Sequence, residues 1–405
     1  MKNDMMKNVK ISIAMMTTLS GPSFKGPQMP MIIKGLIEKG LFGNVYGIWS
    51  GDDRQEYGKH YGRDVQTSKF LKYAFALNKR ICNLFSISHY IMQEKIYGIM
   101  ASHKNYKGNT ILLKPCPGRL VKKFKGQGKT IVIEASENHP RYTFNELKKE
   151  CLLSGQDVPS NNYTNQKHIK EFEDSIKMAD YLICLSEFSA QTYIDQGFER
   201  SRIFVTGLSV GGSIELPKLT QVKPITFVTV ANHGILKGTH RLIELWNRLK
   251  IQNDLLIVGG IYPELKELKE NENNNPNIKF CGTMKREEIY KIYKNIPCVH
   301  ILLSVSESYG RSVYEALTKG VPQIVTPTCT CDYVKDGLNG FIVETHDIDG
   351  LQTAVRKYID MPLSEYETMR KNVYKSVKYS EHSFGDRYIS ALLNCMGGGN
   401  EGAEK

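Results

Sequence analysis

The sequence has no long hydrophobic segment. No run of ~18 consecutive apolar residues occurs among its 405 residues, and the mean hydropathy is −0.35. A membrane-spanning helix is therefore not predicted. The basic residues 1–10 precede an apolar run at 11–16 that is shorter than the ~7–15-residue core of a signal peptide, and no small-residue cleavage pattern follows it. This start predicts a buried first β-strand.

Disulfide and metal-ligand patterns are also sparse. The nine cysteines are scattered, which in a large chain indicates free thiols in a reducing cytoplasm rather than a disulfide framework. Cys329 and Cys331 form a Cys-x-Cys pair, but no second pair stands at zinc spacing, and His346 alone does not complete a site. Asp347 and Asp349 precede a helical pattern, so we interpret one of the two, Asp347 or Asp349, as an N-cap residue. No metal is predicted.

Acidic residues are few in the first half of the chain. Of the net charge of +12, +10 lies in residues 1–200, and the Lys- and Arg-rich segment 104–129 contains no Asp or Glu. Such a field favours an anionic membrane surface or a polyanionic glycan, or it is simply a solvated face. Nucleic acid is not expected, because no recognition motif accompanies the charge. Residues 70–100 mix aromatic and basic side chains at helical spacing, and we favour a core-facing helix there over a membrane-interface one.

Short apolar runs alternate with helical patterns almost throughout, which predicts two doubly wound parallel sheets of the α/β class. We expect an N-terminal domain over residues 1–207, a linker over 208–224 and a C-terminal domain over 225–383. A final helix at 384–395 would cross back to the first domain, and 396–405 would be a disordered tail. Expected strands are 9–16, 45–48, 110–113, 130–134, 181–184, 203–206, 225–230, 254–258, 278–280, 298–303, 323–326 and 340–343. Expected helices are 29–41, 70–100, 120–124, 166–179, 186–196, 239–249, 262–271, 286–295, 310–319, 348–359, 363–380 and 384–393.

The stretch SVSESYGRSVYEALTKG, residues 304–320, places two carboxylates at a strand-to-helix junction. Glu307 precedes the helix, Glu315 lies in its second turn, and the backbone N–H groups of residues 309–311 point out of the helix start. These donors favour phosphate, whereas ionised carboxylates favour hydroxyl groups. A ligand with a diphosphate between two hydroxyl-rich rings is a nucleotide sugar. A Glu315 that only solvates a helix face is the alternative, but its buried neighbours make an unpaired carboxylate costly there.

Glu307-x7-Glu315, followed by Gly320-Val321-Pro322, resembles the retaining glycosyltransferases of family 4, which have the GT-B fold. FVTVANHGILKGTHRLIELWNRL, LLIVGG and NIKFCGTMKREEIYKIY resemble successive units of that family's second domain, and FEDSIKMADYLICLSEFSAQTYIDQGF resembles the end of its first. The resemblance covers most of residues 165–345 and, loosely, 9–50. It implies two Rossmann-like domains facing across a cleft, metal-independent chemistry and a nucleotide-diphosphate sugar as donor.

The resemblance also implies residue roles. Glu307 would hold hydroxyls of the transferred sugar, Glu315 the ribose, and Lys237 the diphosphate of the leaving group. The backbone of Tyr309, Gly310 and Arg311 would contact phosphate and sugar. In the same way, Gly26 would approach the donor phosphates, Gly282 and Thr283 would lie near the base, and His139 would stand near the reacting sugar.

The sequence departs from the family in three places. Where the family carries an Arg before the Lys, this chain has Asn232, and His233, Arg311 or Arg241 would have to compensate. His139 stands a few residues late, which leaves Glu134, Glu137 and His139 open as the group near the sugar, and a simple loop histidine as the alternative. The linker GLSVGGS lacks the family's proline-glycine turn, so the hinge would differ in detail.

The expected function is transfer of a hexose from a UDP- or GDP-sugar to a glycan or lipid-linked acceptor with retention of configuration. The product would be a cell-surface polysaccharide or a glycolipid. The enzyme would act in the cytoplasm, including at the inner face of the cell membrane. A nucleotide-sugar epimerase on the same fold and a non-catalytic module that binds nucleotide sugar or glycan are the alternatives. Donor base, sugar, acceptor, linkage and oligomeric state cannot be predicted from the sequence.

Overall fold

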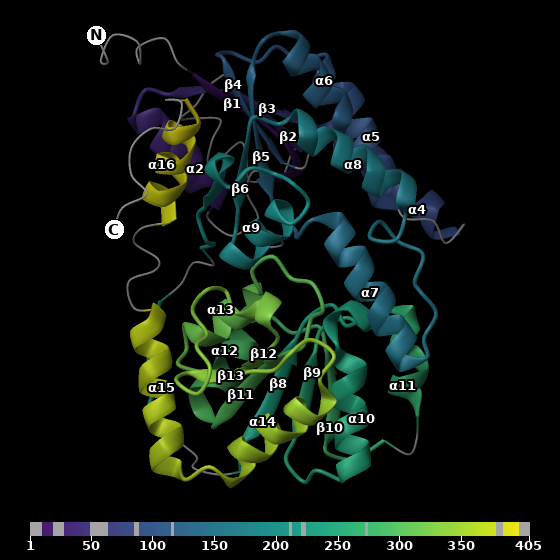
Figure 1. The fold of residues 1–405 in the computed structure, drawn as a ribbon, viewed down its shortest axis with the longest axis vertical. Helices are drawn as coiled ribbons and strands as arrows, with labels where there is room; N and C mark the ends of the chain where they lie inside the picture. Colours follow the sequence, from purple (N-terminus) through teal and green to yellow (C-terminus); the bar gives the residue numbers. More distant parts are fainter. Residues whose placement is uncertain are drawn as a thin grey trace. The chain divides into compact units, whose positions relative to one another are not determined.

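A computed structural model describes residues 10–18, 28–48, 64–84, 89–114, 117–209, 213–219, 224–271, 274–377 and 384–396. The chain divides into two compact units. Unit 1 comprises Met1–Arg141, Ser160–Gly211 and His382–Lys405, and unit 2 comprises Tyr142–Pro159 and Gly212–Glu381. Each unit is built on one parallel β-sheet with helices on both faces (Figure 1), so the predicted α/β class is confirmed.

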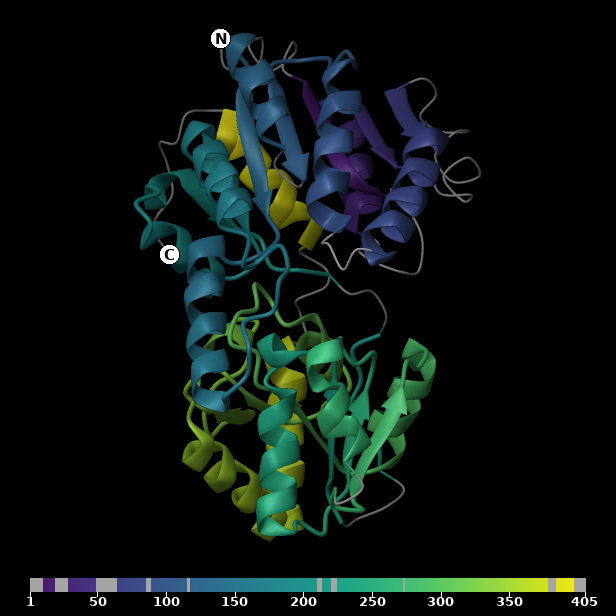
Figure 2. The ribbon, with the colours of Figure 1, turned by 90° about the vertical axis from the view of Figure 1, so that its right-hand side faces the viewer.

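The sheet of unit 1 has seven strands in the order β3-β2-β1-β4-β5-β6-β7. All of its pairings are parallel, and the strands lie side by side in the rotated view (Figure 2). The order reverses between β1 and β4, as in doubly wound folds. The strands are β1 (Ile11–Thr18), β2 (Phe42–Ile48), β3 (Val65–Ser68), β4 (Thr110–Lys114), β5 (Thr130–Ala135), β6 (Tyr181–Cys184) and β7 (Ile203–Val205).

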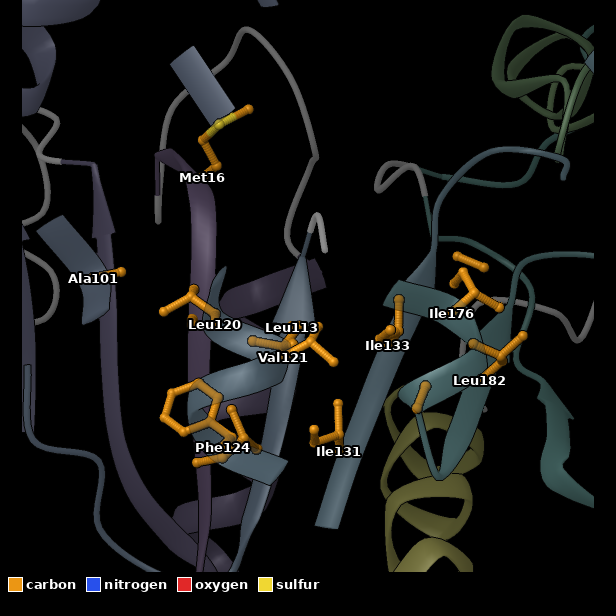
Figure 3. Packing of buried hydrophobic residues seen from close by; sticks show 14 of the residues in the cluster. Met16, Ala101, Leu113, Leu120, Val121, Phe124, Ile131, Ile133, Ile176 and Leu182 are labelled. Carbon is orange, nitrogen blue, oxygen red and sulfur yellow. The ribbon is translucent and has the colours of Figure 1, made fainter. Parts of the chain in front are cut away.

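Alternate residues of these strands point into two different cores, because successive side chains of a strand face opposite ways. Leu113, Ile131 and Ile133 pack against Phe124 and its neighbours on α6 (Figure 3), on the face that also carries α4, α5 and α8. The opposite core joins α2 to α16. The helices of unit 1 are α2 (Gln28–Glu38), α4 (Lys69–Leu84), α5 (His89–Ser102), α6 (Gly118–Gly126), α8 (Gln166–Met178), α9 (Glu187–Ile194) and α16 (Phe384–Met396).

Unit 2 repeats this design with six strands in the order β10-β9-β8-β11-β12-β13. One core packs α10, α14 and α15 against the sheet, and another packs α12 and α13. The strands are β8 (Thr226–Val230), β9 (Leu255–Val258), β10 (Ile278–Gly282), β11 (Cys298–Leu302), β12 (Gln323–Val325) and β13 (Gly340–Ile342). The helices are α7 (Pro140–Ser154), α10 (Thr239–Leu249), α11 (Lys266–Glu270), α12 (Arg286–Asn295), α13 (Arg311–Leu317), α14 (Ile348–Asp360) and α15 (Leu363–Val377), with 3-10 turns η3 (Arg200–Arg202) in unit 1 and η4 (Ile235–Lys237), η5 (Pro263–Leu265) and η6 (Pro327–Cys329) in unit 2.

The structure differs from the sequence prediction at three places. The expected helix over residues 70–100 is two helices, α4 and α5. Helix α7 was not predicted, because its buried face consists of Thr143, Leu147, Glu150 and Cys151 and so lacks an apolar stripe. Strand β3 was also not predicted; it is only four residues long and its sequence, VQTS, is polar.

The division of the chain also differs from the expected boundaries. All of residues 1–207 were assigned to one domain, yet Tyr142–Pro159 belongs to unit 2. Part of the expected linker, residues 213–219, also belongs to unit 2, where the buried Lys319 ammonium donates to Ser213 O at 2.5 Å and pairs with Glu215 at 2.8 Å. Helix α16 packs on α2 in unit 1. No helix within the described ranges is long and apolar enough to cross a membrane.

Candidate functional site

The candidate site lies at the point of unit 2 where the strand order reverses. Strands β8 and β11 are neighbours, and they lead into helices that pack in different cores, α10 in one and α13 in the other. Between such loops an open parallel sheet leaves room for a ligand at the carboxyl ends of its strands. The loop after β8 carries Lys237, and the loop after β11 carries Glu307.

Lys237 and Glu307 form an ion pair although 70 residues separate them in the sequence. Their side chains are about one-fifth exposed, at 22% and 21%, so the pair remains accessible to a ligand. An ammonium beside a carboxylate can bind an anionic group and a hydroxyl group of the same molecule. The structure thus brings together two of the three residues that the sequence assigned to catalysis.

Backbone hydrogen bonds hold the two loops against each other. The N–H of Val305 donates to Leu236 O at 2.9 Å, and the Ser304 hydroxyl donates to the same oxygen at 3.0 Å. Gly238 has a positive φ of 68°, and a Cβ atom there would lie 2.4 Å from Leu303 O. Glycine is therefore required at this position for the loop bearing Lys237 to approach the loop bearing Glu307.

Glu315 is mostly buried and pairs with Arg286, whose Nη2 lies 2.8 Å from its Oε1. Burial raises the pKa of the Glu315 carboxyl, and the charges of Arg286 and Arg311 oppose that shift. Burial likewise lowers the pKa of Arg311, while Glu315 and Glu307 oppose the change. Arg286 was not predicted as a site residue; it is the first residue of α12, three positions after Thr283, which was assigned to the base.

The remaining donor-side residues lie at strand ends of unit 2, and one lies outside the described residues. Tyr309 is buried, with its ring 5.6 Å from that of Tyr314, and Gly310 starts α13 with a φ of 66°. Gly282 and Thr283 are exposed at the carboxyl end of β10. Gly26 falls outside the residues that the structure describes.

His139 lies in unit 1, just before α7. Burial lowers its pKa to about 4, so the imidazole is neutral near pH 7. The N–H of Arg141 donates to Nδ1 at 3.2 Å, which leaves Nε2 as the protonated nitrogen. Of the alternatives, Glu134 is buried in an ion pair with Lys114 and accepts from the Tyr388 hydroxyl at 2.6 Å.

The absence of an Arg at position 232 is not offset by His233. Burial lowers the pKa of His233 to about 4, and its ring nitrogens contact Thr239 Oγ1 at 2.8 Å and Val258 O at 3.0 Å. It is therefore a neutral, fully engaged side chain. Arg241 is occupied by Glu150. Arg311, and the unforeseen Arg286, are the cations that stand beside the predicted donor carboxylates.

The neutral His233 predicts a pH dependence of stability. Its pKa falls from 6.5 in the unfolded chain to about 4 when folded. Between these values the unfolded state binds more protons, so stability drops as the pH falls from 6.5 towards 4. We expect His233→Gln to remove about 1.4 kcal/mol per pH unit from that slope. Thermal unfolding of both proteins between pH 4 and 8 measures how stability changes with pH. Equal slopes of stability against pH below pH 6.5 would contradict a buried, neutral His233. The slopes above pH 6.5 should be equal and provide the internal control.

A buried charge cluster joins α7 to the rest of unit 2. Glu150, with a side chain 1% exposed, contacts Arg241 and His346 and lies 2.6 Å from His240 Nε2. His346 Nε2 also lies 2.9 Å from Glu146. Burial favours the protonated carboxyl, but the His240 hydrogen bond and Arg241 hold the pKa of Glu150 at about 2. The cluster thus links α7 to the rest of unit 2 through ion pairs in which Glu150 stays ionised.

The residues whose spacing could suggest a metal site have structural roles. Asp347 is the N-cap of α14, accepting from the N–H of Gly350 at 2.8 Å, so that prediction is confirmed. Cys329 and Cys331 are buried free thiols, and His346 lies in the Glu150 cluster instead of near them. Across the described part of the chain, no three His, Cys, Asp or Glu side chains are arranged to hold a metal ion.

A pocket of about 420 Å³ lies in unit 1 between α5, α6 and α8, and Glu94, Phe172 and His168 contribute to its walls. Burial raises the pKa of Glu94 to about 8. All of the predicted donor residues described in unit 2 lie elsewhere. Lys95, Arg119 and Lys122 also line this pocket, so its walls carry both acidic and basic groups.

The comparison with protein families decides what unit 2 is. Residues 215–376 match the family described as glycosyl transferases group 1. This segment is a group 1 glycosyltransferase domain. It includes Lys237, Arg286, Glu307 and Glu315. No curated protein sequence matches the chain.

Several solved structures are similar in fold to the whole chain. HepE of Anabaena in complex with UDP-glucose has a TM-score of 0.62 at 15% identity, covering 95% of this chain and 99% of its own. Sucrose-phosphate synthase from Thermosynechococcus elongatus has a TM-score of 0.65 at 15% identity, covering 96% and 100%. The lipopolysaccharide outer core galactosyltransferase WaaB has 0.61 at 14%, covering 95% and 99%. These likenesses establish the GT-B fold of the chain around its group 1 domain.

Proposed function

We propose that the protein is a retaining glycosyltransferase that moves a hexose from a UDP- or GDP-sugar to a glycan or lipid-linked acceptor. The observation that carries the proposal is the Lys237–Glu307 pair at the reversal point of the sheet, inside a group 1 domain. Lys237 would bind the diphosphate and stabilise the charge that develops on the leaving nucleotide. Glu307 would accept hydrogen bonds from sugar hydroxyls.

Further residues of the same unit would hold the rest of the donor. Glu315 would bind the ribose, with Arg286 fixing its carboxylate, and Arg311 would supply the second positive charge that Asn232 does not. The backbone of residues 309–311 would meet phosphate and sugar, and Gly282 and Thr283 would lie near the base. Gly26 and His139 keep their proposed places on the side of unit 1, with a neutral His139 acting as a hydrogen-bond donor through Nε2.

The reaction we propose needs no metal, because lysine and arginine side chains would neutralise the diphosphate. HepE was solved with UDP-glucose, which supports a UDP-sugar as the first donor to test. We place the enzyme in the cytoplasm, with acceptors of cell-surface polysaccharide or glycolipid synthesis at the inner face of the membrane.

Calorimetric titration of UDP, GDP, ADP and their common sugars tests the proposal. We expect one nucleotide to bind, and Glu315→Ala to weaken it about 10- to 100-fold, because a lost hydrogen bond to a charged group costs about 1.5–3 kcal/mol. Glu287→Ala, which changes an exposed glutamate of the neighbouring helix α12, is the matched control. If the folded protein binds no nucleotide, the transferase proposal fails.

The two alternatives give different products. An epimerase would convert the nucleotide sugar to its epimer without an acceptor, and a binding module would hold the nucleotide sugar unchanged. Chromatography of the nucleotide sugar after incubation with the protein separates the three outcomes. Release of free nucleotide, lost in Glu307→Gln, is expected of the transferase.

A further inference from the structure

Both backbone polar groups of Glu307 are bound by one side chain. The N–H of Glu307 donates to the Thr328 hydroxyl oxygen at 2.9 Å, and the same hydroxyl donates to Glu307 O at 2.8 Å. A threonine hydroxyl carries one hydrogen to donate and two lone pairs that accept, so it makes both contacts at once. The two residues are 21 positions apart in the sequence, and this contact was not predicted.

Thr328 lies where a neighbouring strand of the unit 2 sheet ends. Glu307 is in the loop after β11, and Thr328 is in the turn η6, which follows β12, the parallel neighbour of β11. The carboxyl ends of parallel strands meet at the same edge of a sheet, so the turn after β12 packs against the loop after β11. Thr328 is 1% exposed, so bulk water does not compete for its hydroxyl group.

The turn that carries Thr328 is itself restricted in conformation. The ring of Pro327 fixes φ at the first residue of the turn, and the N–H of Cys329 donates to Thr326 O at 2.9 Å across it. The β-branched side chain of Thr328 has few χ1 rotamers. Its hydroxyl therefore points in one direction with little freedom to move.

Other hydroxyl groups of unit 2 hold the residues just before the site carboxylate. Thr326 Oγ1 donates to Ser304 O at 2.7 Å, and Ser306 Oγ lies 2.7 Å from Oγ1 of Thr143 on α7. All four of these residues are buried. The chain up to residue 306 is thus fixed, and the residue that follows starts from a defined position.

The backbone contacts of Glu307 determine how this residue meets a ligand. Its N–H is committed to Thr328, whereas its side chain is about one-fifth exposed and pairs with Lys237. The carboxylate is therefore the part that reaches a ligand, and a fixed backbone leaves only side-chain torsions to vary. Hydrogen bonds of this kind, behind the group that contacts the ligand, hold that group in its productive geometry.

We propose that Thr328 is a positioning residue of the sugar site, whose hydroxyl sets the place from which Glu307 reaches the transferred sugar. The proposal rests on the proposed function, in which Glu307 accepts hydrogen bonds from sugar hydroxyls. A displacement of about 1 Å in such a group can lower the rate about 100-fold. The nucleotide contacts assigned to Lys237 and Glu315 do not pass through Thr328, so its hydroxyl governs transfer of the sugar and not affinity for the nucleotide.

Thr328→Val tests the proposal, because valine keeps the shape of threonine and removes the hydroxyl. With UDP-glucose as the probe, the kcat for release of UDP should fall about 10- to 100-fold, while calorimetry should show unchanged affinity for UDP. Thr328→Ser keeps the hydroxyl and should recover most of the rate. Thr226→Val is the matched control. It changes a buried threonine at the first residue of β8, at the amino ends of the strands and opposite the site, and should leave the rate unchanged.

Amide hydrogen exchange gives a readout that does not need turnover. The Glu307 amide, resolved with overlapping peptides of the segment 304–310, should exchange about tenfold faster in Thr328→Val, because its hydrogen-bond acceptor is lost. The Val305 amide, which donates to Leu236 O, is the internal reference and should keep its rate. Unchanged exchange at Glu307 would contradict the proposal.

Other outcomes would also overturn the proposal. A Thr328→Ser protein as slow as Thr328→Val would assign the effect to packing, and a parallel loss of UDP affinity would assign it to general damage of the site. The two proposals fail in different ways. If the unchanged protein binds no nucleotide, the proposed function has failed; if it binds UDP and Thr328→Val releases UDP at the full rate, the role of Thr328 alone has failed.

Discussion

Replacement of Lys237 by alanine should lower the release of nucleotide from the bound sugar nucleotide about 100- to 1,000-fold, the usual cost of removing one group that stabilises developing charge. The Lys237 ammonium contacts the Glu307 carboxylate directly. Arg286 and Arg241 cannot move into its place without breaking an ion pair, since Arg286 holds Glu315 and Arg241 holds Glu150. Lys237→Arg keeps the charge and should recover part of the rate.

The control for this experiment is Lys279→Ala. Lys279 is also an ion-paired lysine of unit 2, 2.5 Å from Asp254 and half exposed, but it lies on β10 away from the loops that carry the site. Its removal should leave turnover unchanged. A Lys237→Ala protein that retains most of its activity would show that the Lys237–Glu307 pair is structural.

Glu150→Ala is expected to destabilise unit 2 by about 3–5 kcal/mol, the range found when one partner of a buried ion pair is removed. The substitution would leave Arg241, His240 and His346 buried without their carboxylate. For a unit of this size the melting temperature should fall by about 10 °C. Scanning calorimetry measures the change.

Glu146→Ala is the matched control for Glu150. Both residues lie on α7 and both contact His346, but the Glu146 side chain is 24% exposed and has one such contact. Its loss should cost at most about 1 kcal/mol, as for other accessible pairs. If the two substitutions lower the stability equally, the buried cluster is not what holds α7 in unit 2.

The parts of the site that could be predicted are those for which a short, continuous stretch of sequence carries the pattern. The strand and helix patterns around residues 298–317 indicated the junction at which Glu307 and Glu315 stand, and the structure has β11 and α13 there. The resemblance assigned Lys237 and Glu307 to the same donor, but their direct contact was not predicted. Arg286 could not be foreseen as the partner of Glu315, because no local pattern links the first residue of α12 to a side chain on α13.

Helices α7 and α4 illustrate two different limits of prediction from sequence. The buried carboxylate of Glu150 interrupts the apolar stripe by which α7 would be recognised. The partners of Glu150 lie 90 to 196 positions later in the sequence. For α4 the helix was expected but its orientation was not. Apolar residues occur on two of its faces, and hydrophobic patterning alone does not tell which face the protein covers.

The return of α16 to unit 1 has a consequence for synthesis of the chain. One of the two cores of unit 1 is closed by Phe384, Ile389 and Leu392, and a Cβ on Gly35 of α2 would lie only 3.0 Å from the Ile389 side chain. A growing polypeptide therefore exposes this apolar face of the unit 1 sheet until α16 has left the ribosome. The segments of unit 2 precede α16 in the sequence, so unit 1 can be completed only after unit 2 has been synthesised. Chaperone binding would be needed most at α2 during that interval.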